Sequence, residues 1–207
     1  MKKITDIKPQ VKTPARCNIY LDNAFYCGLE LETVMRHRLK TGMDIDAETL
    51  DEIQAESESS RALDKALNFI SRSQKTKKQV SDYLKKKGYT EPTVNAVLEK
   101  MTDYKFVDDG IYAEEYARSV SKNKGKRLIA LELKRKGVSD EDMADALEKI
   151  DGEGEAAERI AEKYLRSKEK TRENAVKCYK YLLSKGFDYD VAKSATDKII
   201  SYEDEDF

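Results

Sequence analysis

The chain has 207 residues, of which 38% are charged and 39% are hydrophobic, and its net charge at pH 7 is −1. A net charge near zero excludes nucleic-acid binding driven by a basic composition of the whole chain. No apolar run approaches the roughly 18 residues of a membrane span, and residues 1–6 lack the apolar core of a secretory signal. The odd count of three cysteines fits reduced thiols, so we expect a cytoplasmic protein with no membrane partner.

Residues 1–56 are expected to form a small α+β segment. Two strand-forming runs, 18–21 and 24–27, flank Asp22-Asn23, a pair that favours a tight turn. This pattern predicts a β-hairpin. Residues 4–11 are expected to add a third strand.

Helices are expected after the hairpin. Residues 30–39 predict one helix, and a second is expected to begin after the N-cap residue Asp46. The tract from Asp44 to Ser60 is acidic and then rich in serine, which indicates a junction with the rest of the chain.

Three glycines, Gly88, Gly137 and Gly186, recur at a spacing of 49 residues. A fixed period of this length is typical of helical repeats, and each glycine suits the end of a helix, where a positive φ is needed. We therefore expect a mainly α fold of tandem three-helix repeats, in three copies and elongated, after the hairpin-containing segment. The expected domains are the N-terminal segment at 1–56, repeats at 61–103, 108–151 and 154–202, and an acidic tail at 203–207.

Positions counted back from each glycine share a chemical type. The residues four and eight before it are apolar, as in one buried helical stripe: Leu84, Leu133, Leu182, Val80, Ile129 and Cys178. The residues twelve before it are expected to be N-caps: Thr76, Gly125 and Asn174. Thr76 with Gln79 predicts a capping box.

The link between the first two copies contains Phe106 and Val107. Both are apolar, so we expect both to be buried at the seam between the repeats. Asp108 or Asp109 is expected to cap the helix that follows.

Basic residues gather on the middle helices of the first two copies. Arg72 to Gly88 contains seven basic residues and one acidic residue, and Arg118 to Gly137 contains eight and one. At 100° per residue, with Val80 and Ile129 inward, the residues two before and five after each are expected to point outward. These outward residues are basic in the first two copies. In the third copy Val176 and Leu183 stand at the matching positions, and Ser184 stands at the position after Leu183.

The candidate partner- or DNA-binding residues are these cations and their neighbours: Lys77, Lys78, Lys85, Lys86, Lys124, Lys126, Arg127, Lys134 and Arg135. Some of them stand in the first turn of a helix, where a cation opposes the helix dipole. That placement in two copies favours a functional role. The alternative is that the lysines only keep exposed helices soluble.

The sequence contains no pattern typical of an enzyme. There is no phosphate-binding loop, and the single histidine, His37, has no nucleophile placed beside it by any motif. The third helix of the second copy is acidic, so we do not expect it to read DNA bases. We expect no catalytic residue, no cofactor and no metal site.

Three strings resemble the RecX family, bacterial regulators of the RecA recombinase: Thr76-x3-Val80-x2-Tyr83-Leu84-x2-Lys87-Gly88-Tyr89, Phe106-Val107-Asp108-Asp109-x2-Tyr112-Ala113-x2-Tyr116, and Gly125-Lys126-Arg127-x-Ile129-x3-Leu133-x2-Lys136-Gly137-Val138. The resemblance covers about residues 60–200, and residues 18–22 are similar to the N-terminal extension of some members.

The resemblance implies a non-enzymatic monomer of three-helix modules, curved into an elongated shape. It also implies binding to RecA along the groove of its filament on DNA, with suppression of its ATPase, strand-exchange and co-protease activities in recombination and repair. Some members also contact DNA. Binding along a filament on DNA would favour positive charge. This chain departs from that expectation, because it is nearly neutral and its third repeat lacks the basic positions.

Two other functions stay open from the residues alone. The first is a stand-alone DNA- or RNA-binding helical-repeat module, and the second is a scaffold whose charges only solubilise it. The acidic tail could compete for the basic positions within the chain, or it could simply add solubility.

Overall fold

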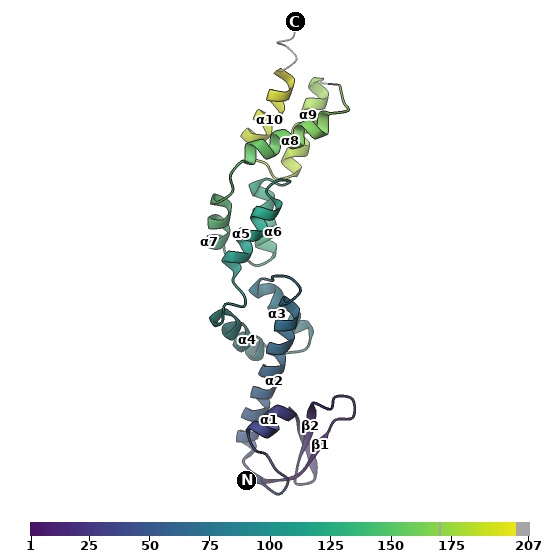
Figure 1. The fold of residues 1–207 in the computed structure, drawn as a ribbon, viewed down its shortest axis with the longest axis vertical. Helices are drawn as coiled ribbons and strands as arrows, with labels where there is room; N and C mark the ends of the chain where they lie inside the picture. The colour runs from purple at the N-terminus through teal and green to yellow at the C-terminus, as the bar shows by residue number, and fades with distance from the viewer. Residues whose placement is uncertain (170, 202–207) are drawn as a thin grey trace. The chain divides into compact units, whose positions relative to one another are not determined.

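The structure is a computed structural model that describes residues 1–169 and 171–201 (Figure 1). It is mainly helical, with three tandem helical repeats and a small N-terminal strand segment, which confirms the predicted fold class. The chain forms two compact units. The first contains Met1–Ser73 and Val80–Phe106, and the second contains Gln74–Gln79 and the chain from Val107 onward. The acidic tail expected at 203–207 lies outside the described residues.

The first unit begins with an antiparallel sheet in the order β3-β2-β1-β4. Its strands are β1 (Lys2–Pro9), β2 (Arg16–Leu21), β3 (Ala24–Glu30) and the short β4 (Asp44–Ile45). The predicted hairpin is confirmed, because β2 pairs with β3 around Asp22 and Asn23, which both have the positive φ of a two-residue hairpin turn. The predicted third strand is β1, whereas β4 was not expected.

Two helices follow the hairpin in the first unit. Helix α1 (Leu31–Arg36) follows β3 directly, and α2 (Ala47–Ile70) runs unbroken through the tract expected to be a junction. The expected junction therefore takes the form of a continuous helix. The tract contains no glycine or proline from 47 to 70, so nothing in it ends a helix. The hydroxyl of Ser57, which is buried, instead accepts a hydrogen bond of 2.9 Å from the N–H of Glu30.

Helix α2 contributes to two cores of the first unit. Leu50 and Ile53, in its first half, pack with the sheet residues around Ile19. The second half is the first helix of the first repeat and contacts α4 (Glu91–Asp103). Between them in sequence lies α3 (Lys77–Lys86), and the ring of its Tyr83 stacks on Phe69 with the centroids 4.2 Å apart.

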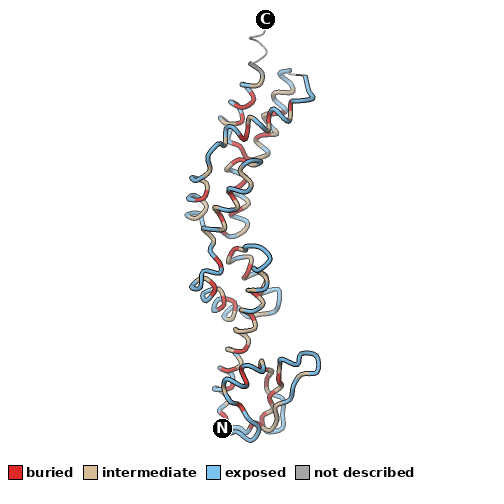
Figure 2. The backbone as a smooth tube through the Cα atoms, in the orientation of Figure 1, coloured by how far each residue is buried: buried red, intermediate tan, exposed pale blue. Residues whose placement is uncertain are grey.

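The second unit contains the other two repeats. The second repeat consists of α5 (Asp109–Val120), α6 (Lys126–Arg135) and α7 (Asp140–Glu148), and the third of α8 (Glu153–Leu165), α9 (Arg172–Ser184) and α10 (Tyr189–Ser201). Each repeat has its own buried cluster, and the predicted stripe residues Ile129, Leu133, Cys178 and Leu182 are fully buried. Figure 2 shows buried residues recurring along these helices with exposed residues between them. This is the pattern of amphipathic helices.

Side-chain caps set several of the helix starts. Thr76 and Gln79 form the predicted capping box, and Asp108 accepts a hydrogen bond from the N–H of Ile111. The N-cap expected at Asn174 is wrong, because α9 starts earlier and Thr171 caps it by accepting from the N–H of Asn174. Thr171 offers a hydroxyl three residues before that N–H, which is the spacing a cap requires.

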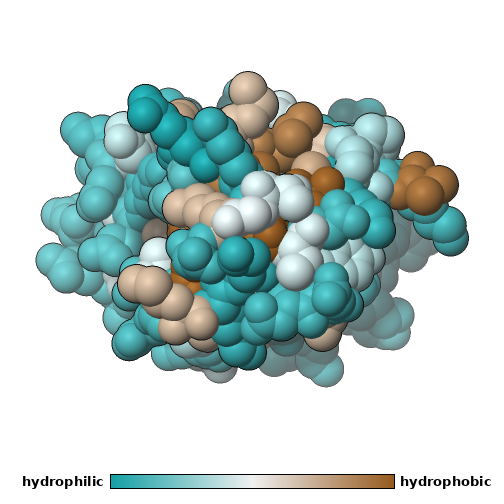
Figure 3. All heavy atoms as spheres, turned by 90° about the horizontal axis from the view of Figure 1, so that it is seen from below, coloured by the Kyte–Doolittle hydropathy of each residue, from teal (hydrophilic) through white to brown (hydrophobic). Residues whose placement is uncertain are grey.

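The segment between α4 and α5 differs from expectation in one residue. Val107 is 3% exposed, as predicted, but Phe106 is 51% exposed. Helix α4 ends in a turn with Lys105 at a φ of 56°, and the N–H of Phe106 donates to the carbonyl of Met101. This turn leaves the ring of Phe106 stacked beside Tyr104 at the surface. The face of the molecule in Figure 3 is likewise mostly hydrophilic with a few hydrophobic side chains among the polar ones.

A recurring joint in the second unit links helix starts to glycine turns. The N–H of Gly125, at the start of α6, donates to the carbonyl of Lys185 at 3.0 Å, at the end of α9. In the same way, the hydroxyl of Thr76 donates to the carbonyl of Lys136 at 2.7 Å, at the end of α6. Because the ends of helices leave backbone groups unpaired, each joint supplies a donor to a carbonyl at a helix end, and at Gly125 it also gives a backbone N–H an acceptor.

The three repeat glycines provide a graded test of this joint. All have nearly the same φ, 88°, 86° and 86°, but an added Cβ meets nothing at Gly88, the side chain of Lys78 at Gly137, and the backbone of Leu128 at Gly186. Replacement by alanine should cost about 1–2 kcal/mol at Gly88 for the left-handed backbone alone. At Gly186 replacement should cost about 1–3 kcal/mol more, because the added Cβ overpacks the site. The cost at Gly137 should lie between those at Gly88 and Gly186. Urea-induced unfolding measures the three losses, and equal losses would contradict the joint.

Candidate partner-binding surface

The nine candidate cations, called the basic face below, lie on or beside α3 and α6 and differ in exposure. Six are exposed: Lys78, Lys85, Lys86, Arg127, Lys134 and Arg135. The other three are half-buried: Lys77, Lys124 and Lys126. Their contacts divide them further, into cations with partners inside the chain and cations without.

Carboxylates from neighbouring helices lie at the first turns of α3 and α6. The backbone N–H of Lys77 donates to Asp109 at 2.8 Å, and that of Lys126 donates to Glu153 at 2.8 Å. Burial raises the pKa of Asp109, while the hydrogen bond from Lys77 acts in the opposite direction. These acids supply the negative charge that a helix start favours, so the cations beside them are less unfavourable than the sequence alone indicated.

Lys78 and Arg127 occupy the same repeat position, and both contact the repeat that follows. The amino group of Lys78 donates to the carbonyl of Arg135 at 3.2 Å. The guanidinium of Arg127 lies 3.8 Å from the carboxylate of Asp188 and 5.1 Å from the ring centre of Tyr189. Both residues are exposed yet already engaged at the joints.

Lys85 and Lys134 also share a repeat position, and each pairs with an acid across the glycine turn. Lys85 lies 2.9 Å from Glu91, and Lys134 lies 3.4 Å from Asp140. All four side chains are at least 43% exposed. Pairs this exposed contribute at most about 1 kcal/mol, so a more strongly charged partner can displace them.

Lys124 belongs to a partly buried network that the sequence did not reveal. Its amino group contacts both carboxylate oxygens of Glu132, at 2.6 and 2.7 Å, and Glu132 accepts from the hydroxyl of Tyr116 at 2.5 Å. Burial acts to raise the pKa of Glu132, but the bonds from Lys124 and Tyr116 hold it below its ordinary value of 4.5. Burial and the bond to Glu132 raise the pKa of Tyr116. Lys124 therefore stabilises the second repeat.

Lys86 and Arg135 are the exposed cations of the basic face whose side chains have no hydrogen bond or ion pair within the described residues. They also share one repeat position, 49 residues apart. Their charges are therefore available to an anionic partner without breaking a contact in the part of the chain that the structure describes.

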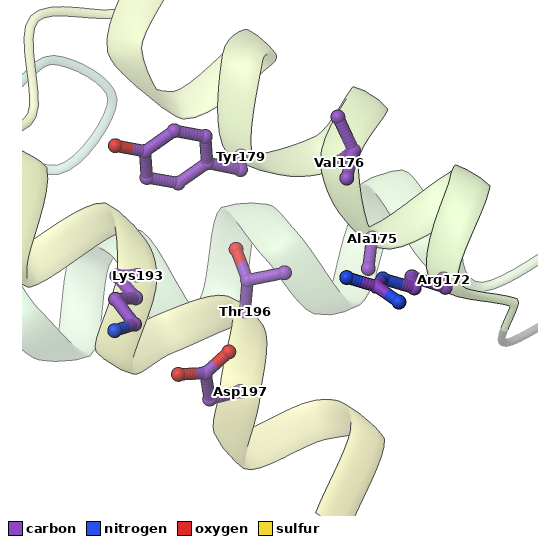
Figure 4. A pocket seen from close by; sticks show the side chains of 7 residues that line it. All are labelled: Arg172, Ala175, Val176, Tyr179, Lys193, Thr196 and Asp197. Carbon is purple, nitrogen blue, oxygen red and sulfur yellow. The ribbon is translucent and has the colours of Figure 1, made fainter.

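The third repeat presents an apolar groove where its helix α9 lacks the cations (Figure 4). Val176, at the position of Lys78 and Arg127, is 46% exposed and lines a groove of about 540 Å³ with Tyr179 and Thr196. Arg172 and Lys193 are also among the lining residues. The third copy, which lacks the basic positions as predicted, thus presents an apolar groove in their place.

Family models match most of the chain. The N-terminal domain of the regulatory protein RecX matches residues 2–46, and the first, second and third three-helix domains of RecX match residues 62–101, 108–147 and 151–196. The chain belongs to the RecX family. The resemblance expected from the three sequence strings is confirmed.

Relatives of the RecX family match at nearly full length. The regulatory protein RecX of Clostridium tetani is 33% identical, over 97% of this chain and 95% of the relative. RecX of Bacillus subtilis is 32% identical, over 100% of this chain and 80% of the relative. A crystal structure of regulatory protein RecX has a TM-score of 0.73 at 27% identity and covers 95% of this chain and 100% of its own.

RecX-family proteins carry the name of regulatory proteins. Burial raises the pKa of the Cys17 and Cys178 thiols and raises that of Cys27 to about 11, which disfavours the nucleophilic thiolate. Within the described residues there is no cluster of three or more metal-binding side chains. No helix in the described part of the chain could span a membrane.

Replacing Glu132 by glutamine tests the network around Lys124. The change should destabilise the second unit by about 1–2 kcal/mol at neutral pH, because it removes a charged, partly buried hydrogen-bond acceptor. The folded-state pKa of Glu132 is lowered, so its stabilisation is present above pH 4.5 and is lost as the pH falls below that value. The difference between the two proteins should therefore shrink in acid, as measured by urea unfolding at several pH values.

Glu91→Gln is the matched control, since it breaks the exposed pair with Lys85. Its loss should stay below about 0.5 kcal/mol. A loss as large as that of Glu132→Gln would show that burial of the network adds nothing.

Proposed function

We propose that this chain binds the RecA recombinase filament on DNA along its groove and inhibits the ATPase, strand-exchange and co-protease activities of RecA. The observation that carries the proposal is membership in the RecX family over nearly the whole chain. The protein acts as a cytoplasmic monomer and needs no cofactor.

The repeated positions of the basic face support a periodic partner. Lys86 and Arg135 stand at one position of consecutive copies, and so do Lys85 and Lys134. Modules of the same kind in tandem offer the same contact more than once, which suits a filament of identical subunits. Free and weakly paired cations meet acidic protein surface or DNA phosphate, and occupation of the groove blocks a second DNA strand or holds the subunits in one state.

Titration of this protein into RecA from the same host on single-stranded DNA, with ATP hydrolysis as the readout, tests the proposal. Hydrolysis should fall as the protein is added. Hydrolysis unchanged at saturating protein would overturn the proposal. A mobility shift with DNA alone, compared with DNA carrying RecA, separates the proposal from a stand-alone DNA- or RNA-binding module.

Charge reversal of Lys86 and Arg135 together should weaken inhibition. The double variant Lys86→Glu, Arg135→Glu should raise the concentration for half-inhibition about tenfold, which corresponds to about 1.4 kcal/mol. It should also reduce the salt dependence of inhibition. Reversal of Arg127 and Lys134, whose charges are already paired, should weaken inhibition less.

The double variant Lys100→Glu, Lys163→Glu is the control, because both lysines are exposed and lie outside the basic face. It makes the same change in net charge and should inhibit as the original protein does. Equal weakening by the control would assign the effect to net charge, and unchanged inhibition by Lys86→Glu, Arg135→Glu would remove the basic face from the mechanism.

A further inference from the structure

A pocket in the first unit brings together cations that lie far apart in the sequence. It has a volume of about 290 Å³ and is lined by Arg16, Glu58, Arg61, Lys65, Lys87, Gly88 and Tyr89. Glu58, Arg61 and Lys65 are spaced to share one face of α2. Arg16 begins β2, and the remaining residues form the glycine turn after α3. The pocket exists because α2 is continuous between the sheet and the first repeat.

Tyr89 sets this glycine turn apart from the other two. The residue after the glycine is Val138 in the second repeat and Phe187 in the third, and both are buried in their cores. Tyr89 is only half-buried, and its hydroxyl makes no hydrogen bond to any described residue. Burial raises the pKa of Tyr89, while Arg61 and Arg16, which line the same pocket, act in the opposite direction.

The positive charge of the pocket exceeds what its carboxylates neutralise. Glu30 lies 3.3 Å from Nε of Arg16 and 3.7 Å from Nε of Arg61, and Glu58 is the other acid. Four cations against two carboxylates leave a net charge of +2. Nε of Arg16 is buried beside Glu30, whereas Lys65 has no ion pair within the described residues. The positive charge that these carboxylates leave unneutralised favours an added anion.

We propose that this pocket binds a phosphate monoester dianion. A phosphate monoester carries close to two negative charges at neutral pH, which matches the excess charge, whereas a single carboxylate carries one. Guanidinium groups bind phosphate oxygens through paired hydrogen bonds, lysines add point charge, and the hydroxyl of Tyr89 donates one more bond. The volume lies just below the usual range for small-molecule sites, so it suits a phosphate with little more than the group that bears it.

Isothermal titration of the full chain, without RecA, tests the site. The probes are inorganic phosphate, adenosine monophosphate, and an oligonucleotide with and without a 5′-phosphate. Inorganic phosphate should bind one per chain, and Arg61→Gln and Lys65→Gln should each weaken that binding at least fivefold. Lys100→Gln, an exposed lysine of the same unit, is the matched control and should change nothing.

The outcomes separate the source of the phosphate from the existence of the site. Tighter binding of adenosine monophosphate supports a free nucleotide, and tighter binding only of the 5′-phosphorylated oligonucleotide supports a nucleic-acid end. No binding of any probe, or binding that Arg61→Gln and Lys65→Gln leave unchanged, would overturn the proposal. Because RecA is absent, this result is independent of the test of RecA inhibition.

Discussion

The second unit depends on the meeting of helix ends at its joints. At each joint the first residues of one middle helix donate to the last carbonyls of the middle helix in the next copy, as Gly125 does to Lys185. The acceptors are carbonyls at a helix end, which the helix cannot satisfy by itself, and the donor is a backbone N–H at Gly125 and a side-chain hydroxyl at Thr76. A glycine is required at the end that is approached, because its φ is positive and, at Gly186, the backbone of Leu128 occupies the space of a Cβ.

The joints also decide which cations are available to a partner. Lys78 and Arg127 stand at helix starts, so their side chains reach the following copy and find a carbonyl or a carboxylate there. Lys86 and Arg135 stand at helix ends, and although the carbonyl of Arg135 accepts from Lys78, both side chains keep their charge free within the described chain. A basic stretch of sequence thus contains both cations that contact the following copy and cations that stay available to a partner. Only the contacts in the structure distinguish the two groups.

Local signals in the sequence predicted the elements that local chemistry controls. The hairpin follows from Asp22-Asn23, the repeats from the glycine spacing, and the capping box from Thr76 and Gln79. The continuity of α2 was missed because an acidic, serine-rich tract resembles a linker until the partner of Ser57 is known. The network of Tyr116, Glu132 and Lys124 and the pocket around Arg16 and Tyr89 were missed for a related reason. Their members lie on different elements, and no periodicity connects them.

The copies share a backbone but differ in the chemistry that they display. The glycine turns have the same φ to within 2°, yet the following residue is Tyr89, Val138 or Phe187. When the turn geometry is held by glycine and by the joint, the next side chain is free to fill a core or to line a pocket. The same freedom replaces a cation of the first two copies with Val176 and gives the third an apolar groove. In such an array the fold and the repeated cations come from what the copies share, and the positions at which they differ give single copies surfaces of their own.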